Sequence, residues 1–564
     1  MEYLLIAVLA LPLIFLAVLL LLNENQNKAY HKIVWLSALI QLILSSIIFV
    51  ASYNDANTGY FIFYRIPWFD LDLGQLGKLG VDFLVGVDGL SAPLLWLSSL
   101  VIFLAASYSS EIKKFRKGYF ALFLVLSVTI PGCFVALDLF LFYVFFEFML
   151  LPMFFLIGIW GGKRRDYASV KFFLYTLAGS IFILIVFIGV YTSTFDPYKT
   201  VQYFNENVTV GAVQKMVFMD QLPTADIYHS FDLTVISDNK NMLKGSILSL
   251  VGSTQIFGYP ARLIAFLAIF IGFAVKLPAF PFHTWLPDAH VEAPTPISVI
   301  LAGILLKIGG YGFIRIVYPL FPEGVIQFSW LIALIGVISI IYGALNALAM
   351  SDLKKLIAYS SVSHMGFVLL GIASLTAEGI SGAIYQMFSH GLISATLFLI
   401  AGVVYNRTHD RSINAYSGLA SKMPRYTIVV TVAFFASIGL PGFSGFIAEL
   451  LVFLGAFDSY SVNELVPRWM PLVATIGLIL GAAYYLWTLQ RMFFGKFAVK
   501  DVSWSNLLTD LNKREQAIFY PMVILMFLFG IFSSFLLETI NEFVASFSDH
   551  IYKTALENYK FLKF

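Results

Sequence analysis

The sequence predicts an all-α polytopic membrane protein with about fourteen transmembrane helices. Hydrophobic residues make up 59% of the 564 residues and charged residues only 12%, about half of the charged share in soluble domains. Long apolar runs recur along the whole chain, and many reach the roughly 20 residues that a membrane helix needs. Basic residues gather in alternate loops, as the positive-inside rule requires.

The apolar runs define the predicted spans. The first run follows the acidic Glu2 and lacks a small-residue cleavage site, so we expect a retained helix and not a signal peptide. Tight joins, around Leu137 and around Ser351, separate two pairs of neighbouring spans. The predicted spans lie near residues 3–22, 31–52, 86–108, 118–136, 138–160, 168–194, 261–281, 295–318, 328–350, 355–375, 380–405, 426–456, 470–493 and 516–540.

The loops after odd-numbered spans hold most of the basic residues, and the loops after even-numbered spans hold few. Positive charge favours the cytoplasmic side, so both chain termini are predicted to face outside. The net charge of +2 is too small to indicate a nucleic-acid partner. The basic residues in question are Lys28, Lys32, Lys113, Lys114, Arg116, Lys117, Lys163, Arg164, Arg165, Lys354, Lys355, Arg407, Arg411, Lys422, Arg425, Arg491, Lys496 and Lys500.

Three outside segments are long enough to fold. Residues 60–82 contain the aromatic and apolar run 61–64 and the alternating run 69–73, with glycines after it, which is typical of a β-hairpin. Residues 195–260 form a polar insertion. The sequence does not decide whether this insertion is a packed cap or a mobile loop. The tail, residues 541–564, has the pattern of an amphipathic helix that lies on the surface or on a neighbour.

A lysine and a proline interrupt the seventh span. Lys276 stands within an apolar run that begins near Leu263, and Pro278 follows two residues later. Proline removes a backbone N–H and clashes with the preceding turn, so the helix is predicted to break beside Lys276. A buried ammonium in a membrane normally faces a bundle interior or a water cavity, which indicates an ion pathway. The alternative is a lysine that reaches the interface from a helix end.

Three further charges lie in apolar surroundings. Glu147 is near the middle of the fifth span, between aromatic residues that would keep water away. Lys307 is flanked by glycines, which allow close helix approach or local unwinding. Glu449 follows a second break, at Pro441 and Gly442, in the twelfth span. A structural ion pair is the alternative interpretation for each of the three.

Two histidines extend this series of charges. His364 and His390 lie in the tenth and eleventh spans. Taken singly, each could be a hydrogen-bonded packing residue. Histidine accepts and releases protons near neutral pH, so the whole set predicts a proton path through the membrane. The set consists of Glu147, Lys276, Lys307, His364, His390 and Glu449.

Breaks in corresponding spans indicate an internal repeat. The seventh and twelfth spans are both interrupted, which points to inverted repeats of the kind found in transporters. The fourth to eighth spans would form one repeat and the ninth to thirteenth spans the other. The predicted units are N-terminal helices in 1–117, a first repeat in 118–318, a second repeat in 328–493, and the last span with the tail in 494–564.

Five stretches of the sequence carry long, specific motifs: 145–153, 274–278, 282–290, 302–307 and 356–366. These motifs resemble those of the antiporter-like subunits of respiratory complex I. The resemblance runs from about residue 80 to 500. Among the L, M and N types it is best for the M type, whose twelfth helix has a glutamate that Glu449 matches. The L, N and Mrp types have lysine there, and the L type needs a long lateral helix, for which the tail is too short.

The resemblance implies a proton-translocating subunit in the membrane arm of NADH:quinone oxidoreductase. It implies a bacterial inner membrane with periplasmic termini, L and N subunits as neighbours, and NADH, FMN, iron–sulfur clusters and quinone in other subunits. No cofactor or metal is expected in this chain, whose one cysteine, Cys133, excludes an intrachain disulfide and a cysteine-ligated cluster. The expected path runs from the Glu147–Lys276 pair to Lys307, and through the histidines to Glu449.

Other functions stay open at this point. An Mrp-type Na+/H+ antiporter subunit and a membrane subunit of a related hydrogenase complex share the fold. Glu449 argues against the Mrp type, because that type has lysine at the matching position. A scaffold without pumping is a further alternative, against which the six ionisable residues in apolar helices argue.

Overall fold

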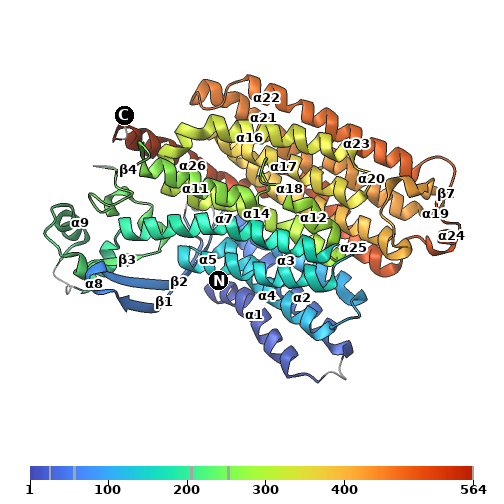
Figure 1. The fold of residues 1–564 in the computed structure, drawn as a ribbon, viewed down its shortest axis with the longest axis horizontal. Helices are drawn as coiled ribbons and strands as arrows, with labels where there is room; N and C mark the ends of the chain where they lie inside the picture. Colours follow the sequence, from blue (N-terminus) through green and yellow to red (C-terminus); the bar gives the residue numbers. More distant parts are fainter. Residues whose placement is uncertain (24–26, 55–58, 204–207, 251–253, 562–564) are drawn as a thin grey trace.

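The computed structural model describes residues 1–23, 27–54, 59–203, 208–250 and 254–561. Within these ranges, thirteen helices are long and apolar enough to cross a membrane. They pack into one bundle (Figure 1), so the predicted all-α membrane fold is confirmed. The predicted count was about fourteen. The difference lies at the seventh span, where α11 (Ala261–Lys276) has only 16 residues before the helix ends.

The helices of the bundle follow the predicted order, and several spans consist of more than one helix. Apart from α11, they are α1 (Glu2–Leu21), α2 (Asn27–Asn54), α3 (Ser91–Tyr108), α4 (Arg116–Val135), α5 (Leu139–Phe148), α6 (Leu150–Trp160), α7 (Arg165–Ser193), α12 (Trp285–Glu292), α13 (Thr295–Ile300), α14 (Leu306–Gly312), α15 (Tyr318–Leu320), α16 (Pro322–Ala349), α17 (Leu353–Ser374), α18 (Ala377–Thr408), α20 (Pro424–Ile438), α21 (Ser444–Val462), α22 (Trp469–Ala474), α23 (Ile476–Phe493) and α25 (Lys513–Ile531).

Two aspartates explain the tight joins between neighbouring spans. The side chain of Asp138 caps α5 by accepting a hydrogen bond from the backbone N–H of Leu141. Asp352 caps α17 by accepting from the backbone N–H groups of Lys354 and Lys355. A capping side chain satisfies N–H groups that the first helical turn leaves free. The chain can therefore start a new helix directly after each short join.

Both predicted breaks are present, and the fifth span contains a third. α11 ends at Lys276, and the twelfth span is divided between α20 and α21. In the fifth span, α5 ends before Met149 and α6 begins after it. Pro152 lacks the N–H that would bond the carbonyl of Phe148, so the helix is interrupted there. Glu147 thus lies in the last turn of α5 and, as expected, near the middle of the fifth span, Leu139–Trp160.

A hairpin lies where the sequence predicts one and is longer than expected. β1 (Ile62–Asp72) and β2 (Lys78–Val87) pair antiparallel, and β3 (Tyr228–Ser230) pairs with β2 in parallel. Because β2 continues to Val87, the third span begins at Ser91, later than the sequence indicated. The parallel strand comes from the insertion, so hairpin and insertion form one outer layer.

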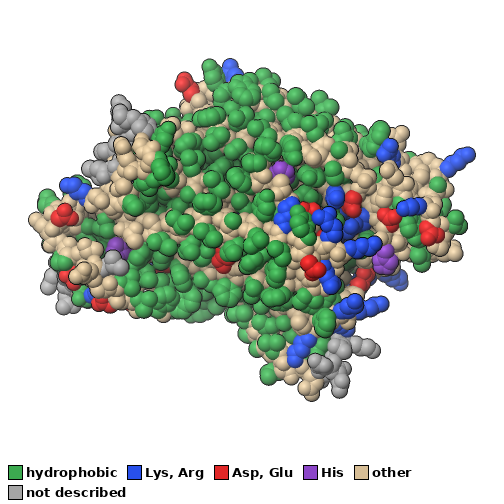
Figure 2. Space-filling model, in the orientation of Figure 1, with side chains coloured by type: hydrophobic (Ala, Val, Ile, Leu, Met, Phe, Trp, Pro, Cys, Tyr) green, Lys and Arg blue, Asp and Glu red, His purple; other side chains and the backbone are tan. Residues whose placement is uncertain are grey.

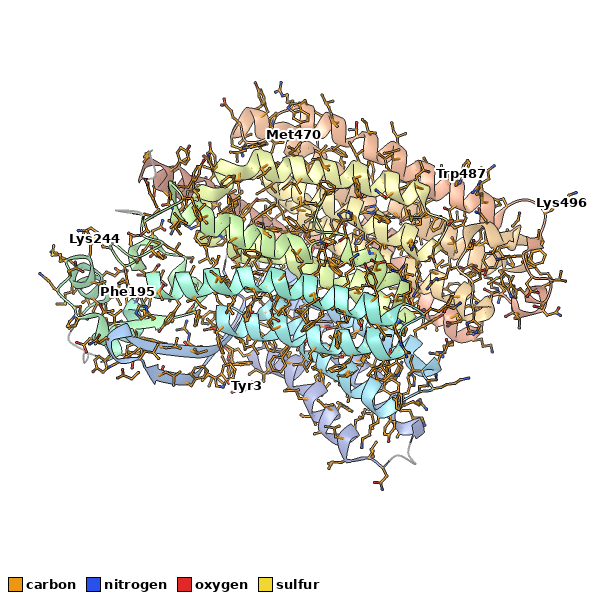
Figure 3. The ribbon with its side chains drawn as sticks, in the orientation of Figure 1. Tyr3, Phe195, Lys244, Met470, Trp487 and Lys496 are labelled. Atoms are coloured by element: carbon orange, nitrogen blue, oxygen red, sulfur yellow. The ribbon has the colours of Figure 1, made fainter. Side chains whose placement is uncertain are left out.

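The described part of the insertion, residues 195–260, is a packed cap rather than an open loop. A small core of its own holds the cap together, formed by Phe195, Val213, Val217 and Ile227. Figure 3 labels Phe195 and Lys244 within it. Besides β3, its elements are α8 (Pro197–Tyr203), α9 (Val210–Phe218), α10 (Leu233–Ile236), β4 (Gln255–Ile256) and β5 (Tyr259–Pro260).

The C-terminal tail is a long amphipathic helix that packs on its own chain. α26 (Ser534–Phe561) begins before the predicted tail and lies against α16 and α18. Asn558 donates a hydrogen bond to the carboxylate of Glu323 in α16 at 3.0 Å. The apolar face of the helix is covered by the bundle through Leu536, Ile540, Val544, Ile551 and Ala555, which recur at helical spacing.

Charges divide the two ends of the bundle. Figure 2 shows Lys and Arg side chains gathered at the right of the view, away from the cap. Lys496, labelled in Figure 3, lies at that basic end. The N-terminus and the end of α26 lie in the left half of Figure 1, toward the cap. If the basic end is cytoplasmic, as the positive-inside rule predicts, the cap is outside.

Cysteine labelling in intact cells tests the orientation. In a Cys133→Ser background, we expect an impermeant thiol reagent to label Lys244→Cys in the cap and to leave Arg165→Cys at the basic end unlabelled. Both positions are exposed, so both should react after the membrane is permeabilised. The reverse pattern in intact cells would overturn the predicted orientation.

Candidate functional site

Lys276 lies buried at the break that ends α11. It is 2% exposed, and its Nζ makes no hydrogen bond to the residues that the structure describes. The ammonium lies 4.6 Å from the centre of the Phe146 ring. Glu147, the residue after Phe146, carries the negative charge that acts on Lys276. Its Oε1 also has no hydrogen-bond partner among the described residues. Lys276 and Glu147 thus interact electrostatically, without a hydrogen bond between them among the described residues.

Lys307 and His390 are in direct contact. α14 lies between two π-helical turns, Leu301–Leu305 and Phe313–Val317. Such turns widen a helix and are frequent at functional sites. Lys307 Nζ reaches back to donate to the carbonyl of Ala302 at 2.5 Å, and it lies 2.8 Å from His390 Nδ1. The predicted local unwinding around Lys307 thus takes the form of two π-turns.

Gly309 brings Lys307 close to the break after Lys276. A Cβ on Gly309 would lie 2.7 Å from the backbone nitrogen of Leu277. Glycine therefore permits an approach between α14 and the end of α11 that a larger residue would prevent. This contact joins the end of α11, which carries Lys276, to the helix that carries Lys307.

The two histidines lead from Lys307 to Glu449. The ring centroids of His390 and His364 are 5.2 Å apart. His364 Nε2 lies 3.8 Å from Glu449 Oε1. A small cavity lies between these groups, with a lining that includes His364, Gln386, Ser389, His390, Ser437 and Glu449. The structure thus joins four of the six predicted residues into one series.

Backbone carbonyls hold the imidazole of His364 on both sides. Nδ1 lies 2.8 Å from the carbonyl oxygen of Ser360, and Nε2 lies 3.1 Å from that of Ser437. A carbonyl oxygen only accepts hydrogen bonds, and an imidazolium has two N–H donors where the neutral ring has one. The site can therefore receive a second proton on His364 without leaving a donor unpaired, which suits a residue that passes protons on.

The break in the twelfth span makes room for Glu449. α20 ends at Ile438, and the following Gly439 has a φ of +78°, the left-handed conformation that favours glycine. A Cβ at Gly439 would collide with Glu449 Oε2. Ser437, whose carbonyl receives His364, belongs to the last turn of the same helix, where carbonyls lack intrahelical partners. One helix end thus accommodates the carboxylate and supplies an acceptor for the histidine.

Several buried polar residues near this series escaped the sequence analysis. Lys354, counted there with the loops, is buried at the start of α17 and donates to the carbonyl of Ala293 at 2.9 Å. Its position directly before an apolar run was the available signal. His290, within a motif that the sequence analysis used only for the resemblance, is also fully buried. The hydroxyl residues around His364, for which no sequence signal existed, are Ser360, Ser437 and Tyr485.

Two buried ion pairs lie outside this series. Arg262 and Glu323 are 2.6 Å apart and join α11 to α16. Arg315 and Asp88 are also 2.6 Å apart and join the end of the eighth span to the start of α3. Close geometry and further hydrogen bonds compensate the burial of such charges. Arg315 lies within a predicted span, so its charge was a signal that the sequence analysis overlooked.

Known proteins resemble the chain over almost its full length. The profile of the family described as "NADH:quinone oxidoreductase/Mrp antiporter, TM" matches residues 136–468. The NADH-quinone oxidoreductase subunit M of Rhodobacter capsulatus is 39% identical over 548 residues, which cover 97% of this chain and 96% of that protein. The subunit M of Rickettsia prowazekii (strain Madrid E) is 40% identical over 532 residues, 94% of this chain and 95% of that protein.

Solved structures share the fold. A chain of the structure titled "Respiratory complex I from Thermus thermophilus with bound NADH" has a TM-score of 0.76 at 28% identity, and the match covers 97% of this chain and 99% of that one. A chain of the Mrp complex from Dietzia sp. DQ12-45-1b has a TM-score of 0.74 at 19% identity, with 98% and 99% covered. The second likeness shows the fold alone.

Proposed function

The chain belongs to the NADH:quinone oxidoreductase/Mrp antiporter transmembrane family, and we propose that it is the M-type, proton-translocating subunit in the membrane arm of an NADH:quinone oxidoreductase. Electron transfer takes place in other subunits, which bind NADH, FMN, iron–sulfur clusters and quinone. Quinone reduction there drives protons across the membrane through this chain. Relatives named subunit M match it over nearly its whole length, which supports this assignment.

One observation supports proton transfer most directly: Lys307, His390, His364 and Glu449 form a buried series of neighbouring ionisable groups. Ionisable side chains are costly within a membrane, and a structural role would favour closed ion pairs like Arg262–Glu323. This series instead contains two histidines, which exchange protons near neutral pH. Its arrangement is therefore better suited to moving protons than to holding helices together.

The proposed mechanism is electrostatic. Glu147 stabilises the charged form of Lys276, so weakening of that pair releases a proton toward Lys307. The attraction between two unit charges falls as their separation grows, so movement of Glu147 away from Lys276 favours the neutral lysine. The proton then passes through His390 and His364 to Glu449, which exchanges it with the outside. Charge changes in a neighbouring subunit could drive Glu147 by the same physics.

The proposed setting follows from the family and the charge pattern. The L- and N-type subunits are the neighbours of this chain in a bacterial inner membrane, with the cap and both termini on the periplasmic side. The fourth to eighth and ninth to thirteenth spans are two inverted repeats. The breaks beside Lys276 and Gly439 occupy corresponding places in them, which supports the repeat.

An Mrp-type antiporter subunit and a hydrogenase-linked membrane subunit remain the competing functions. The Mrp chain shares the fold at 19% identity, whereas the two subunit M relatives are 39% and 40% identical. Glu449 also agrees with the M type, since the resemblance implies a lysine at this position in the Mrp type. These two observations favour the NADH-linked function.

Purification of the intact assembly tests the proposed function. We expect an affinity-tagged chain to co-purify with L- and N-type subunits and with subunits that oxidise NADH. NADH:quinone activity in the eluate, absent from a mock purification of untagged cells, should accompany them. Recovery with Mrp subunits or with a hydrogenase, and without NADH oxidation, would replace the assignment.

A further inference from the structure

Gln386 is a buried amide that faces the space between His364 and Glu449. It is 2% exposed, and its side-chain oxygen has no hydrogen-bond partner among the residues that the structure describes. It lies on α18, one turn before His390, and it lines the small cavity that both histidines and Glu449 also line. A buried polar group without a partner destabilises a fold. The position of this amide therefore points to a ligand in the cavity.

Close packing of α18 on α21 brings the amide to Glu449. A Cβ on Gly382 would lie 2.5 Å from a backbone nitrogen of α21 that follows Glu449 in the sequence. On the other side of Gln386, Ser389 donates to the hydroxyl of Ser444, which precedes Glu449, at 2.8 Å. These two contacts flank Gln386 on one helix and Glu449 on the other. The amide and the carboxylate therefore reach the same cavity.

The step from His364 to Glu449 needs an intermediary. His364 Nε2 and Glu449 Oε1 are 3.8 Å apart, which exceeds the length of a hydrogen bond. Water can bridge two polar groups at such a distance. The cavity has a volume of about 10 Å³, which leaves room for one water molecule. A buried water makes about three hydrogen bonds, and the histidine, the carboxylate and the Gln386 amide all border this space.

We propose that Gln386 holds a water molecule in this cavity and that this water carries the proton from His364 to Glu449. The water receives the proton that leaves Nε2 and gives another of its protons to the carboxylate, so it is regenerated while one proton moves. An amide offers both an acceptor oxygen and N–H donors, and it does not titrate. It therefore binds the water in either orientation without keeping the proton. Gln386 is thus a positioning residue, and its role rests on the proposed function.

A structure of the intact complex, at a resolution that shows ordered water, tests the site itself. We expect a water within hydrogen-bond distance of the Gln386 amide and of Glu449 in the parent, and none there in Gln386→Met. Methionine has nearly the length of glutamine but offers only a weakly accepting thioether. A dry cavity in the parent, or a water that keeps its place in Gln386→Met, would contradict the proposal.

Proton pumping by the complex in sealed vesicles tests the transfer step. At equal amounts of assembled complex, we expect the pumping rate of Gln386→Met to fall about tenfold, the upper range for one lost hydrogen bond. Gln386→Asn keeps an amide on a shorter side chain, so it should bind water and pump faster than the methionine variant. Parent-like pumping by Gln386→Met, or an equal loss in both variants, would show that the amide has no part in the transfer.

A matched variant removes a buried glutamine outside the path. Gln41 of α2 is also buried, and it donates to the carbonyls of Val8 and Ser127 at 3.0 and 2.7 Å. Per assembled complex, Gln41→Met should pump like the parent. A loss as large as that of Gln386→Met would assign both defects to damaged packing and overturn the proposed role.

Glu449→Gln in the same vesicles separates this inference from the proposed function. Normal pumping there contradicts the proposed function. Blocked pumping there, beside parent-like pumping by Gln386→Met, contradicts only the role of Gln386. If Gln386→Met does not assemble, the parent structure still decides, because a dry cavity overturns the inference and an ordered water on the amide supports it.

Discussion

Glu449→Gln is expected to stop proton pumping while the complex still assembles. The amide has nearly the shape of the carboxylate, so it should fit the space beside Gly439, but it cannot accept and release a proton. Loss of a group that transfers protons typically lowers a rate by about a hundredfold or more. Pumping would be followed in sealed vesicles with a pH-sensitive dye, with NADH oxidation and subunit abundance measured in parallel.

Related substitutions sharpen this result. Glu449→Asp should keep partial pumping with a changed pH profile, because the shorter carboxylate still ionises but lies farther from His364. Glu449→Lys should retain some pumping if the site needs only a titratable group. Asp458→Asn is the control, since Asp458 is an exposed carboxylate on the same helix, α21. Parent-like pumping by Glu449→Gln would place the outward end of the path at another group.

Lys276→Arg is expected to lose pumping although it preserves the positive charge. A guanidinium stays protonated in proteins, so it can pair with Glu147 but cannot pass a proton to Lys307. We expect pumping per NADH to fall by about a hundredfold or more, with normal subunit abundance. Lys276→Ala should lose pumping as well, and Lys496→Ala, an exposed lysine at the basic end, should not.

This comparison distinguishes proton transfer from a structural ion pair. If Lys276 only stabilises the fold, arginine should restore what alanine loses, and normal pumping by Lys276→Arg would establish that structural role. Glu147→Gln completes the set, because it removes the charge that acts on Lys276 and leaves the lysine able to titrate. Its pumping should fall strongly, and an unchanged value would remove Glu147 from the mechanism.

Much of the fold was predictable because its signals are local. An apolar run of sufficient length indicates a membrane helix wherever it occurs. Pro278 and Pro441 indicate helix breaks, because proline has no backbone N–H to donate. The break at Met149 was missed although Pro152 was visible, because the surrounding apolar run was long enough for one span. The sequence did not decide between a packed cap and a mobile loop at 195–260. The small core of the cap consists of residues that follow no helical or strand periodicity in the sequence.

The membrane class, the order of the spans and the identity of the six ionisable residues could be obtained from the amino-acid sequence, because a charge in an apolar run stands out among its immediate neighbours. Their grouping depended on tertiary packing. Lys307 and His390 are 83 positions apart and meet at 2.8 Å because α14 packs against α18. Tyr485 of α23 contacts Ser360, which lies beside His364, and Gly439 leaves space for a carboxylate on another helix. Contacts of this kind follow from how helices pack in three dimensions, which no local spacing of residues records.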